Sequence, residues 1–210
     1  MIRVLIADDH AILRRGLIDI LTRGLDGVVC GEAEDANQAL AQVAQHDWDL
    51  VILDVTMPGR SGADVLGDLK RARPKVPVLV LSVHPEDQYG RRMFKAGASG
   101  YLNKESAPEE LLKAVRKVLA GGRYVGPRLA ESLAGSLVED AARPVHESLS
   151  AREFEVLRMI AFGKTVGQIA DELRLSVPTV STYRARILEK MNLKSNAELM
   201  RYALQNRLVD

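Results

Sequence analysis

Five short apolar segments alternate with segments of helical periodicity over the first 121 residues. The apolar segments are rich in Val, Ile or Leu and span residues 2–7, 28–33, 50–54, 78–82 and 100–103. Short apolar runs of this kind are typical of strands that are covered on both faces. The helix-period segments between them span about 11–23, 36–46, 62–72, 86–97 and 108–120. Five such units predict an α/β fold, a five-stranded doubly wound parallel sheet.

The last part of the chain has no strand signal and is predicted to be all-α. Its helix-period segments lie near 151–162, 166–174, 177–191 and 195–205. Ser150 is followed three residues later by Glu153, which is a capping-box pattern for the first of these helices. Ser176 can cap the third helix, and Pro178 is tolerable in its first turn. The pattern predicts a four-helix domain.

The chain of 210 residues is long enough for two domains. Gly121-Gly122 ends the last helix of the first domain, which is predicted to span 1–122. Residues 123–147 are predicted to be a linker, in which Leu129, Leu133 and Leu137 have the spacing of a short helix. The helical domain then spans 148–210.

Composition excludes several classes of protein. Apolar residues make up 47% of the chain and charged residues 27%, as in ordinary globular proteins. The N-terminal segment turns acidic at Asp8-Asp9, unlike a secretory signal, and no apolar run approaches the ~18 residues that span a membrane. A single cysteine, Cys30, excludes an internal disulfide. We therefore expect a cytoplasmic protein with no membrane partner.

The net charge of +1 is unevenly distributed. Residues 1–125 carry 17 basic and 17 acidic side chains, whereas residues 148–210 carry 10 basic and 7 acidic side chains. A basic surplus in the helical domain favours a nucleic-acid partner, although a small surplus is common in domains of other function.

Polar side chains follow four of the five predicted strands. Asp8 and Asp9 follow the first, Asp54 ends the third, Ser82 ends the fourth and Lys104 follows the fifth. Ligands of open α/β sheets bind outside the carboxyl ends of the strands, so these side chains are expected to converge. Neighbouring carboxylates repel one another, and Mg²⁺ would relieve that repulsion. One carboxylate is then available as a nucleophile toward a phosphoryl group.

At these residues the sequence resembles the receiver domains of two-component response regulators, which have a flavodoxin-like or CheY-like fold. The resemblance covers residues 1 to about 122. It is carried by four motifs, Ala7-Asp8-Asp9-His10, Leu53-Asp54-Val55-Thr56-Met57-Pro58-Gly59-Arg60-Ser61-Gly62, Leu81-Ser82, and Gly97-Ala98-Ser99-Gly100-Tyr101-Leu102-Asn103-Lys104.

The resemblance implies that Asp54 accepts a phosphoryl group from a sensor histidine kinase. It also implies that Asp9, Asp54 and the backbone carbonyl of Thr56 hold Mg²⁺, with Asp8 acting through a water molecule. Such a protein is not a classical enzyme, although the receiver can catalyse its own phosphorylation and dephosphorylation.

Three further residues take roles from the same resemblance. Ser82 would donate a hydrogen bond to the phosphoryl group, and Lys104 would pair with it. Tyr101 matches an aromatic switch that turns inward when the serine moves. His10 and His84 lie near the rim of the site and are interpreted as bystanders.

Residues 166–191 have the pattern of a helix-turn-helix. At 100° per residue, Val180, Ile187 and Met191 share one face of the second helix, and residues such as Ser181 and Arg186 point away from it, available to the major groove. Arg186, Lys190 and Lys194 form a basic stripe suited to phosphate contacts, although a solvated helix face has the same pattern.

The helical domain resembles the LuxR/GerE-type output domain in Leu149 to Leu157, Ser176 to Tyr183, Ile187 to Met191 and Ala197 to Ala203. With the receiver, the chain resembles the NarL/FixJ class of transcription regulators nearly end to end. The resemblance implies binding to double-stranded promoter DNA and, when phosphorylated, a homodimer that uses the final helix, about 195–205. The predicted DNA-contacting residues are Thr179, Ser181, Thr182, Tyr183, Arg186 and Lys190.

Two other hypotheses have distinct signatures. An aspartyl-phosphate phosphatase of haloacid-dehalogenase type would need a second aspartate two residues after Asp54, where this chain has Thr56. A constitutive DNA-binding protein would not need the acidic pair, Ser82 or Lys104. Kinase choice is expected to depend on surface residues of the first helix, such as Leu13, Arg14 and Leu17, but the sequence does not identify the kinase, the stimulus or the target genes.

Overall fold

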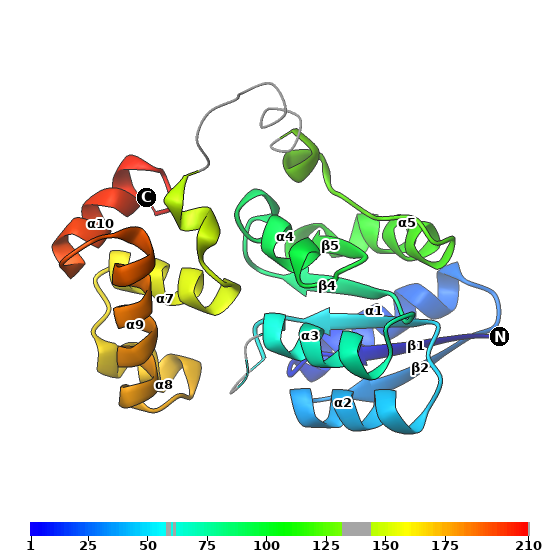
Figure 1. Ribbon diagram of the computed structural model, residues 1–210. Coiled ribbons are helices and arrows are strands. Elements are labelled where there is room, and N and C mark those ends of the chain that lie inside the picture. Colours follow the sequence, from blue (N-terminus) through cyan, green and yellow to red (C-terminus); the bar gives the residue numbers. More distant parts are fainter. Residues whose placement is uncertain (58–59, 61, 132–143, 210) are drawn as a thin grey trace. The chain divides into compact units, whose positions relative to one another are not determined.

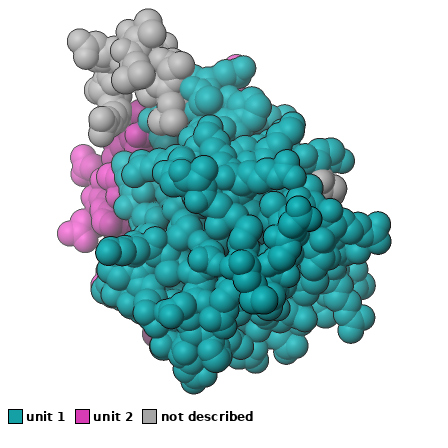
Figure 2. Space-filling model, turned by 90° about the vertical axis from the view of Figure 1, so that its right-hand side faces the viewer, with its two compact units in different colours: residues 1–139 teal, residues 140–210 magenta. Residues whose placement is uncertain are grey.

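Two compact units, residues 1–139 and 140–210, make up the chain (Figure 2). The computed structural model describes residues 1–57, 60, 62–131 and 144–209. Leu133 and Leu137 of the expected linker helix, and Pro58, Gly59 and Ser61 of the motif after the third strand, lie outside the described residues.

The first unit contains a five-stranded parallel sheet (Figure 1). The strands run in the order β2-β1-β3-β4-β5. They are β1 (Ile2–Ala7), β2 (Val28–Ala33), β3 (Leu50–Asp54), β4 (Val78–Ser82) and β5 (Gly100–Asn103). Every residue of β3 and β4 is buried, which explains why these central strands read as uninterrupted apolar runs. The predicted fold class and strand positions are therefore confirmed.

Helices cover both faces of this sheet. α1 (Ala11–Gly24) packs beside α5 (Ala107–Leu119), and α3 (Gly62–Ala72) packs between α2 (Ala36–Gln45) and α4 (Glu86–Lys95). α4 ends two residues before its predicted end, because Ala96 caps it and Gly97 has a φ of +106°, in the left-handed region.

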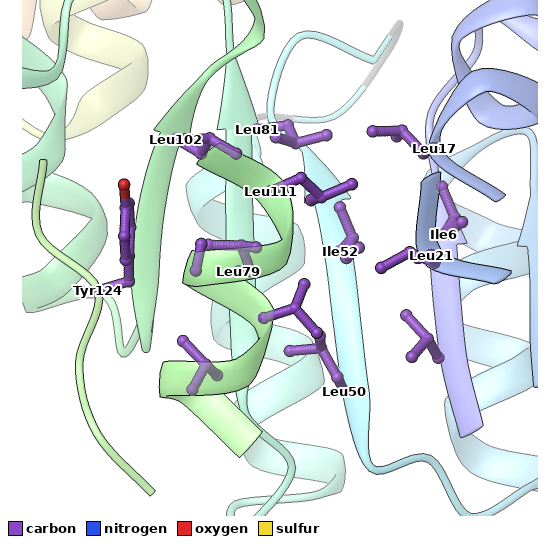
Figure 3. Packing of buried hydrophobic residues seen from close by; sticks show 14 residues of the cluster. Ile6, Leu17, Leu21, Leu50, Ile52, Leu79, Leu81, Leu102, Leu111 and Tyr124 are labelled. Carbon is purple, nitrogen blue, oxygen red and sulfur yellow. The ribbon is translucent and has the colours of Figure 1, made fainter. Parts of the chain in front are cut away.

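A hydrophobic core lies between the sheet and the pair α1–α5 (Figure 3). Leu17 and Leu21 of α1 and Leu111 of α5 meet apolar side chains from the strands. The prediction that Arg14 and Leu17 lie on the surface is wrong, since they are 5% and 1% exposed. Both occupy the apolar face of α1 together with Leu21, so they cannot form a surface recognition code.

The beginning of the predicted linker packs against the first unit. Tyr124 forms a parallel bridge with Gly100 of β5, and residues 127–131 form a helical turn. Leu129 in this turn is fully buried, and Tyr124 is 9% exposed. Tyr124 and Leu129 therefore anchor this part of the predicted linker to the first unit.

The second unit consists of short helices. The 3-10 turn η2 (Val145–Ser148) precedes α7 (Ala151–Ala161), α8 (Val166–Leu173), α9 (Val177–Met191) and α10 (Asn196–Gln205). α7 packs against both α9 and α10, and α8 packs against α9. The core of this unit contains three completely buried side chains, Phe154, Leu157 and Ile169. The all-α prediction for this region is confirmed.

Side-chain caps set the starts of these helices. Ser150 and Glu153 form the predicted capping box, and the Ser176 hydroxyl accepts a hydrogen bond from the Thr179 backbone N–H. Arg174, with a φ of 51°, ends α8 in the left-handed conformation, so α8 and α9 are joined by a tight turn. Among the helices that the structure describes, none combines the length and the apolar character needed to cross a membrane.

Candidate functional sites: an acidic cluster and a helix-turn-helix

The carboxyl ends of β1 and β3 bring acidic side chains together. Asp8 follows β1 and is 1% exposed, and Asp54, the last residue of β3, is fully buried. β1 and β3 are neighbours in register, with Ala7 opposite Leu53, so the residues that follow are adjacent. Asp9 also belongs to the cluster and is partly exposed. The predicted convergence of these carboxylates is present in the structure.

The Lys104 ammonium pairs with two of these carboxylates. Its ammonium Nζ lies 2.7 Å from Asp54 Oδ2 and 2.8 Å from Asp8 Oδ2. Burial of the Lys104 side chain lowers its pKa, but the two carboxylates outweigh that effect and hold the pKa above its usual value. The side chain is therefore a fixed positive charge at the centre of the cluster.

The other oxygen of Asp54 is held by the loop after β3. Oδ1 accepts hydrogen bonds from the backbone N–H of Thr56, at 2.8 Å, and from its hydroxyl, at 2.6 Å. Thr56 therefore orients the carboxylate, and Lys104 fixes its second oxygen. The sequence predicted a role only for the carbonyl of Thr56. The contact of its hydroxyl with Asp54 Oδ1 is visible only in the structure.

Arg14 holds the loop that carries the acidic pair. The Arg14 guanidinium donates to the backbone carbonyl of Asp8 at 2.8 Å and pairs with Glu32 at 2.9 Å and Glu34 at 3.1 Å. The Asp8 backbone N–H donates to Ala33 of β2 at 3.1 Å. The sequence signal for this role is the position of Arg14 on the apolar face of α1.

The cluster has the donors that a divalent cation requires. One ligand atom each from Asp8, Asp9, His10 and Asp54 lies within 4.8 Å of the others. Asp8 Oδ2 is buried and faces Lys104 Nζ at 2.8 Å. His10 Nδ1 lies 2.8 Å from Asp9 Oδ1. Three carboxylates that converge in this way carry more negative charge than one ammonium can offset, and their oxygens are the donors that a divalent cation prefers.

Ser82 ends β4, the strand next to β3, and Tyr101 lies within β5, the following strand of the sheet. Ser82 is fully buried, and its Oγ accepts a hydrogen bond from the His84 backbone N–H at 3.0 Å. Tyr101 is also fully buried, and its hydroxyl donates to the His84 carbonyl at 2.9 Å. Burial raises the pKa of Tyr101 well above its usual value. The tyrosine already points inward in this structure.

The second candidate site is α9. Val180, Ile187 and Met191 are buried, which confirms the predicted inner face. On the outer face Ser181, Thr182, Ala185 and Arg186 are exposed. Thr182 Oγ1 donates to the Pro178 carbonyl at 2.9 Å. Short polar side chains and one guanidinium therefore face solvent along the helix.

Two predicted contact residues in α9, Lys190 and Thr179, also have structural partners. Lys190 Nζ lies 2.7 Å from Oε2 of Glu153, whose side chain is 4% exposed. Thr179 contributes to the cap with Ser176, and Tyr183 is half-buried. The basic stripe predicted for Arg186, Lys190 and Lys194 therefore includes one lysine that already has a carboxylate partner.

Comparisons with known proteins identify both units. A family model described as the response regulator receiver domain matches residues 4–116, and a model described as bacterial regulatory proteins of the luxR family matches residues 147–203. The chain is 38% identical to the response regulator GacA of Pseudomonas aeruginosa, over 100% of this chain and 99% of GacA. It is 35% identical to the response regulator UvrY of Escherichia coli K12, over 99% of this chain and 96% of UvrY.

Solved structures show the same combination of units. The structure of RcsB from Salmonella enterica serovar Typhimurium, bound to promoter rprA in the presence of the phosphomimetic BeF3⁻, matches with a TM-score of 0.68 and 28% identity. The match covers 96% of this chain and 97% of the RcsB chain. A second structure, of an RcsB–DNA complex, matches with a TM-score of 0.60 and 26% identity over 96% of each chain.

Proposed function

The chain belongs to the two-component response regulators of the NarL/FixJ class, which regulate transcription, and from this premise we propose that Asp54 is the phosphoacceptor of its receiver domain. The observation that carries the proposal is the placement of Asp54. It is a fully buried carboxylate, with one oxygen held by Thr56 and the other facing the Lys104 ammonium. A sensor histidine kinase would be the donor, and this protein would receive the phosphoryl group in the cytoplasm.

The nucleophile in this proposal is Asp54 Oδ2, the oxygen that faces Lys104. A P–O bond forms between this oxygen and the phosphorus as the P–N bond to the kinase imidazole breaks, and the electron pair remains on the imidazole. Lys104 stays within reach of the new phosphoryl oxygens and offsets their charge. Ser82, on the neighbouring strand, is placed to donate its hydroxyl hydrogen to one of them.

The proposed metal is Mg²⁺. Asp9, Asp54 and the carbonyl of Thr56 would hold it, with Asp8 acting through water, because oxygen ligands and retained waters suit this ion. When bound, Mg²⁺ supplies positive charge that stabilises the transferring phosphoryl group. The role of the protein is to hold the carboxylates together, which Lys104 and the Arg14 contact with the Asp8 backbone achieve.

The output of the proposed switch is a homodimer bound to promoter DNA. Phosphorylation would shift a pre-existing equilibrium between forms of the receiver, with Ser82 and Tyr101 as the residues that respond. The solved RcsB structures bound to DNA support this output by similarity. We propose that α9 enters the major groove, with contacts from Thr179, Ser181, Thr182, Tyr183 and Arg186 and a weaker contact from Lys190, which is tied to Glu153.

The decisive experiment compares the wild type with Asp54→Ala, each with Mg²⁺ and with or without acetyl phosphate. Intact mass, oligomeric state and binding to double-stranded promoter DNA would be measured on the full chain. We expect the donor to add one phosphoryl group to the wild type, to promote its dimerisation and to strengthen its DNA binding. Asp54→Ala should show none of these changes.

Two results would count against this function. Equal DNA binding by both proteins, with or without donor, would favour a constitutive DNA-binding protein. Phosphorylation of Asp54→Ala to the same extent would move the phosphoacceptor to another residue. The omission of Mg²⁺ is a further control, because the proposal requires slower phosphorylation of the wild type without it.

A further inference from the structure

Residues 124–131, named the latch here, are fastened to two elements of the receiver domain. At the edge of β5, the Tyr124 backbone N–H donates to the Ser99 carbonyl at 3.0 Å, and the Tyr124 carbonyl accepts from the Tyr101 N–H at 3.3 Å. On α4, the Glu86 carboxylate accepts a hydrogen bond from the Leu129 backbone N–H at 3.1 Å. A segment with backbone contacts at both ends and a fully buried leucine is a docked element of the domain.

The surface of α4 is shaped to receive the latch. A methyl group at Gly90 would lie 2.5 Å from Leu129 Cδ2, and one at Gly126 would lie 1.9 Å from Glu86 Oε2. A larger residue at either position would force the Leu129 or the Glu86 side chain to move. Glu86 is itself 8% exposed, so its carboxylate is held inside this contact. A buried carboxylate that loses a hydrogen-bond donor raises the free energy of the folded domain. The stability of the docked latch therefore depends on the position of Glu86.

The same stretch of chain connects Glu86 to the phosphorylation site. Ser82 Oγ accepts the His84 N–H, and the Tyr101 hydroxyl donates to the His84 carbonyl. Glu86 follows His84 by two residues and begins α4. The turn from β4 to α4 is thus held at one end by Ser82 and Tyr101, and at the other end it holds Leu129.

We propose that the latch, held by Glu86 and Gly90, is released when Asp54 is phosphorylated, and that this release carries the signal from the receiver into the connection with the second unit. The inference rests on the proposed function. When the Ser82 side chain moves its Oγ toward the phosphoryl group, the hydrogen bond from the His84 N–H to that oxygen breaks and the turn rearranges. Glu86 then moves, and the Leu129 N–H loses its acceptor in turn.

Thermodynamic linkage makes the proposal reciprocal. If phosphorylation favours the released latch, a variant whose latch is already released must bind a phosphoryl analogue more tightly by the same factor. Couplings between sites are commonly about 5- to 150-fold. Leu129→Ala removes the buried anchor and should raise the affinity for beryllofluoride, measured with Mg²⁺, by a factor in this range.

The experiment follows amide hydrogen exchange of the full chain over residues 124–131. In the wild type, acetyl phosphate with Mg²⁺ should increase exchange in this segment. In Leu129→Ala the exchange should be fast with or without donor, whereas Arg128→Ala, which changes an exposed neighbour in the same turn, should behave as the wild type. Gly90→Ala should also speed exchange there, and Gly67→Ala, in open space on α3, should not.

The outcomes separate this inference from the proposed function. If mass spectrometry shows phosphorylation of Asp54 and exchange over residues 124–131 is unchanged or slower, the latch proposal is overturned while the phosphoacceptor stands. If Asp54 is not phosphorylated but beryllofluoride affinity still rises in Leu129→Ala, the latch coupling stands and the donor chemistry is wrong. Equal beryllofluoride affinity in Leu129→Ala and Arg128→Ala also overturns the latch.

Discussion

At the scale of single residues, each of two buried charges in this protein is held by specific partners. Lys104 is held between Asp8 and Asp54, and Glu153 is bound by Lys190 and by the Ser150 N–H. In both cases the partners come from distant parts of the chain or from a helix terminus. The removal of one partner leaves a charge with little access to water, which is more costly than the loss of a surface ion pair.

The Glu153 contact predicts a pH dependence for the second unit. Burial raises the pKa of Glu153, but the hydrogen bonds from Lys190 and Ser150 outweigh it and hold the pKa below the usual 4.5. The stabilisation is therefore complete above about pH 4.5 and is lost as the pH falls through the lower pKa of the folded state. Glu153→Gln should be less stable than the wild type at pH 7 by about 1 kcal/mol, since a hydrogen bond to a charged group is the stronger kind.

Amide exchange of α7 measures this difference, because Trp48, the single tryptophan, reports only on the first unit. The gap between the wild type and Glu153→Gln should narrow as the pH falls below 4.5. Glu189→Gln, at an exposed position of α9, serves as the control and should show no comparable gap at pH 7. A gap that is constant from pH 7 to pH 3 would mean that the Glu153 charge contributes nothing.

At the scale of elements, α9 has two kinds of basic residue. Arg186 lies exposed on the outer face, whereas Lys190 is tied to Glu153 of α7. Arg186→Ala should lower the slope of log K against log salt for DNA binding by about 1 per subunit, because it removes one phosphate contact. Lys190→Ala should change that slope less and should instead destabilise the second unit.

Binding of the phosphorylated protein to double-stranded DNA at several salt concentrations tests this ranking. Lys113→Ala removes an exposed charge from α5 of the first unit and controls for net charge. If Lys190→Ala lowers the slope as much as Arg186→Ala does, Lys190 leaves Glu153 on binding and contacts phosphate, and the ranking is wrong.

At the scale of the whole molecule, the proposed switch depends on two units acting together. If each subunit neutralises ~3 phosphates, a dimer should bind DNA with a log–log salt slope of roughly −5, and a monomer with about half of that. The phosphorylated wild type should show the steeper slope and a stoichiometry of two chains per site. A slope near −5 for unphosphorylated Asp54→Ala would show that dimeric binding does not need phosphorylation of Asp54. A salt titration of the affinity gives the slope, and a titration of the DNA with protein at concentrations well above Kd gives the stoichiometry.

Local sequence patterns determined much of this protein. The strand ranges, the helix caps at Ser150 and Ser176 and the inner face of α9 follow from short-range periodicity and from side chains that satisfy nearby backbone groups. The convergence of the acidic residues was predictable too, because the carboxyl ends of parallel strands must lie at one edge of the sheet.

Tertiary packing decided the rest. No local pattern pairs Lys190 with Glu153. A stretch that contains Pro and Gly predicts a linker whether or not a leucine within it packs against α4. Arg14 was predicted to lie on the surface of the first helix. In the structure it is buried, because its guanidinium pairs with three acceptors that lie in or directly after β1 and β2. A polar or isolated apolar residue is placed by partners far away in the sequence, and only the folded chain brings those partners together.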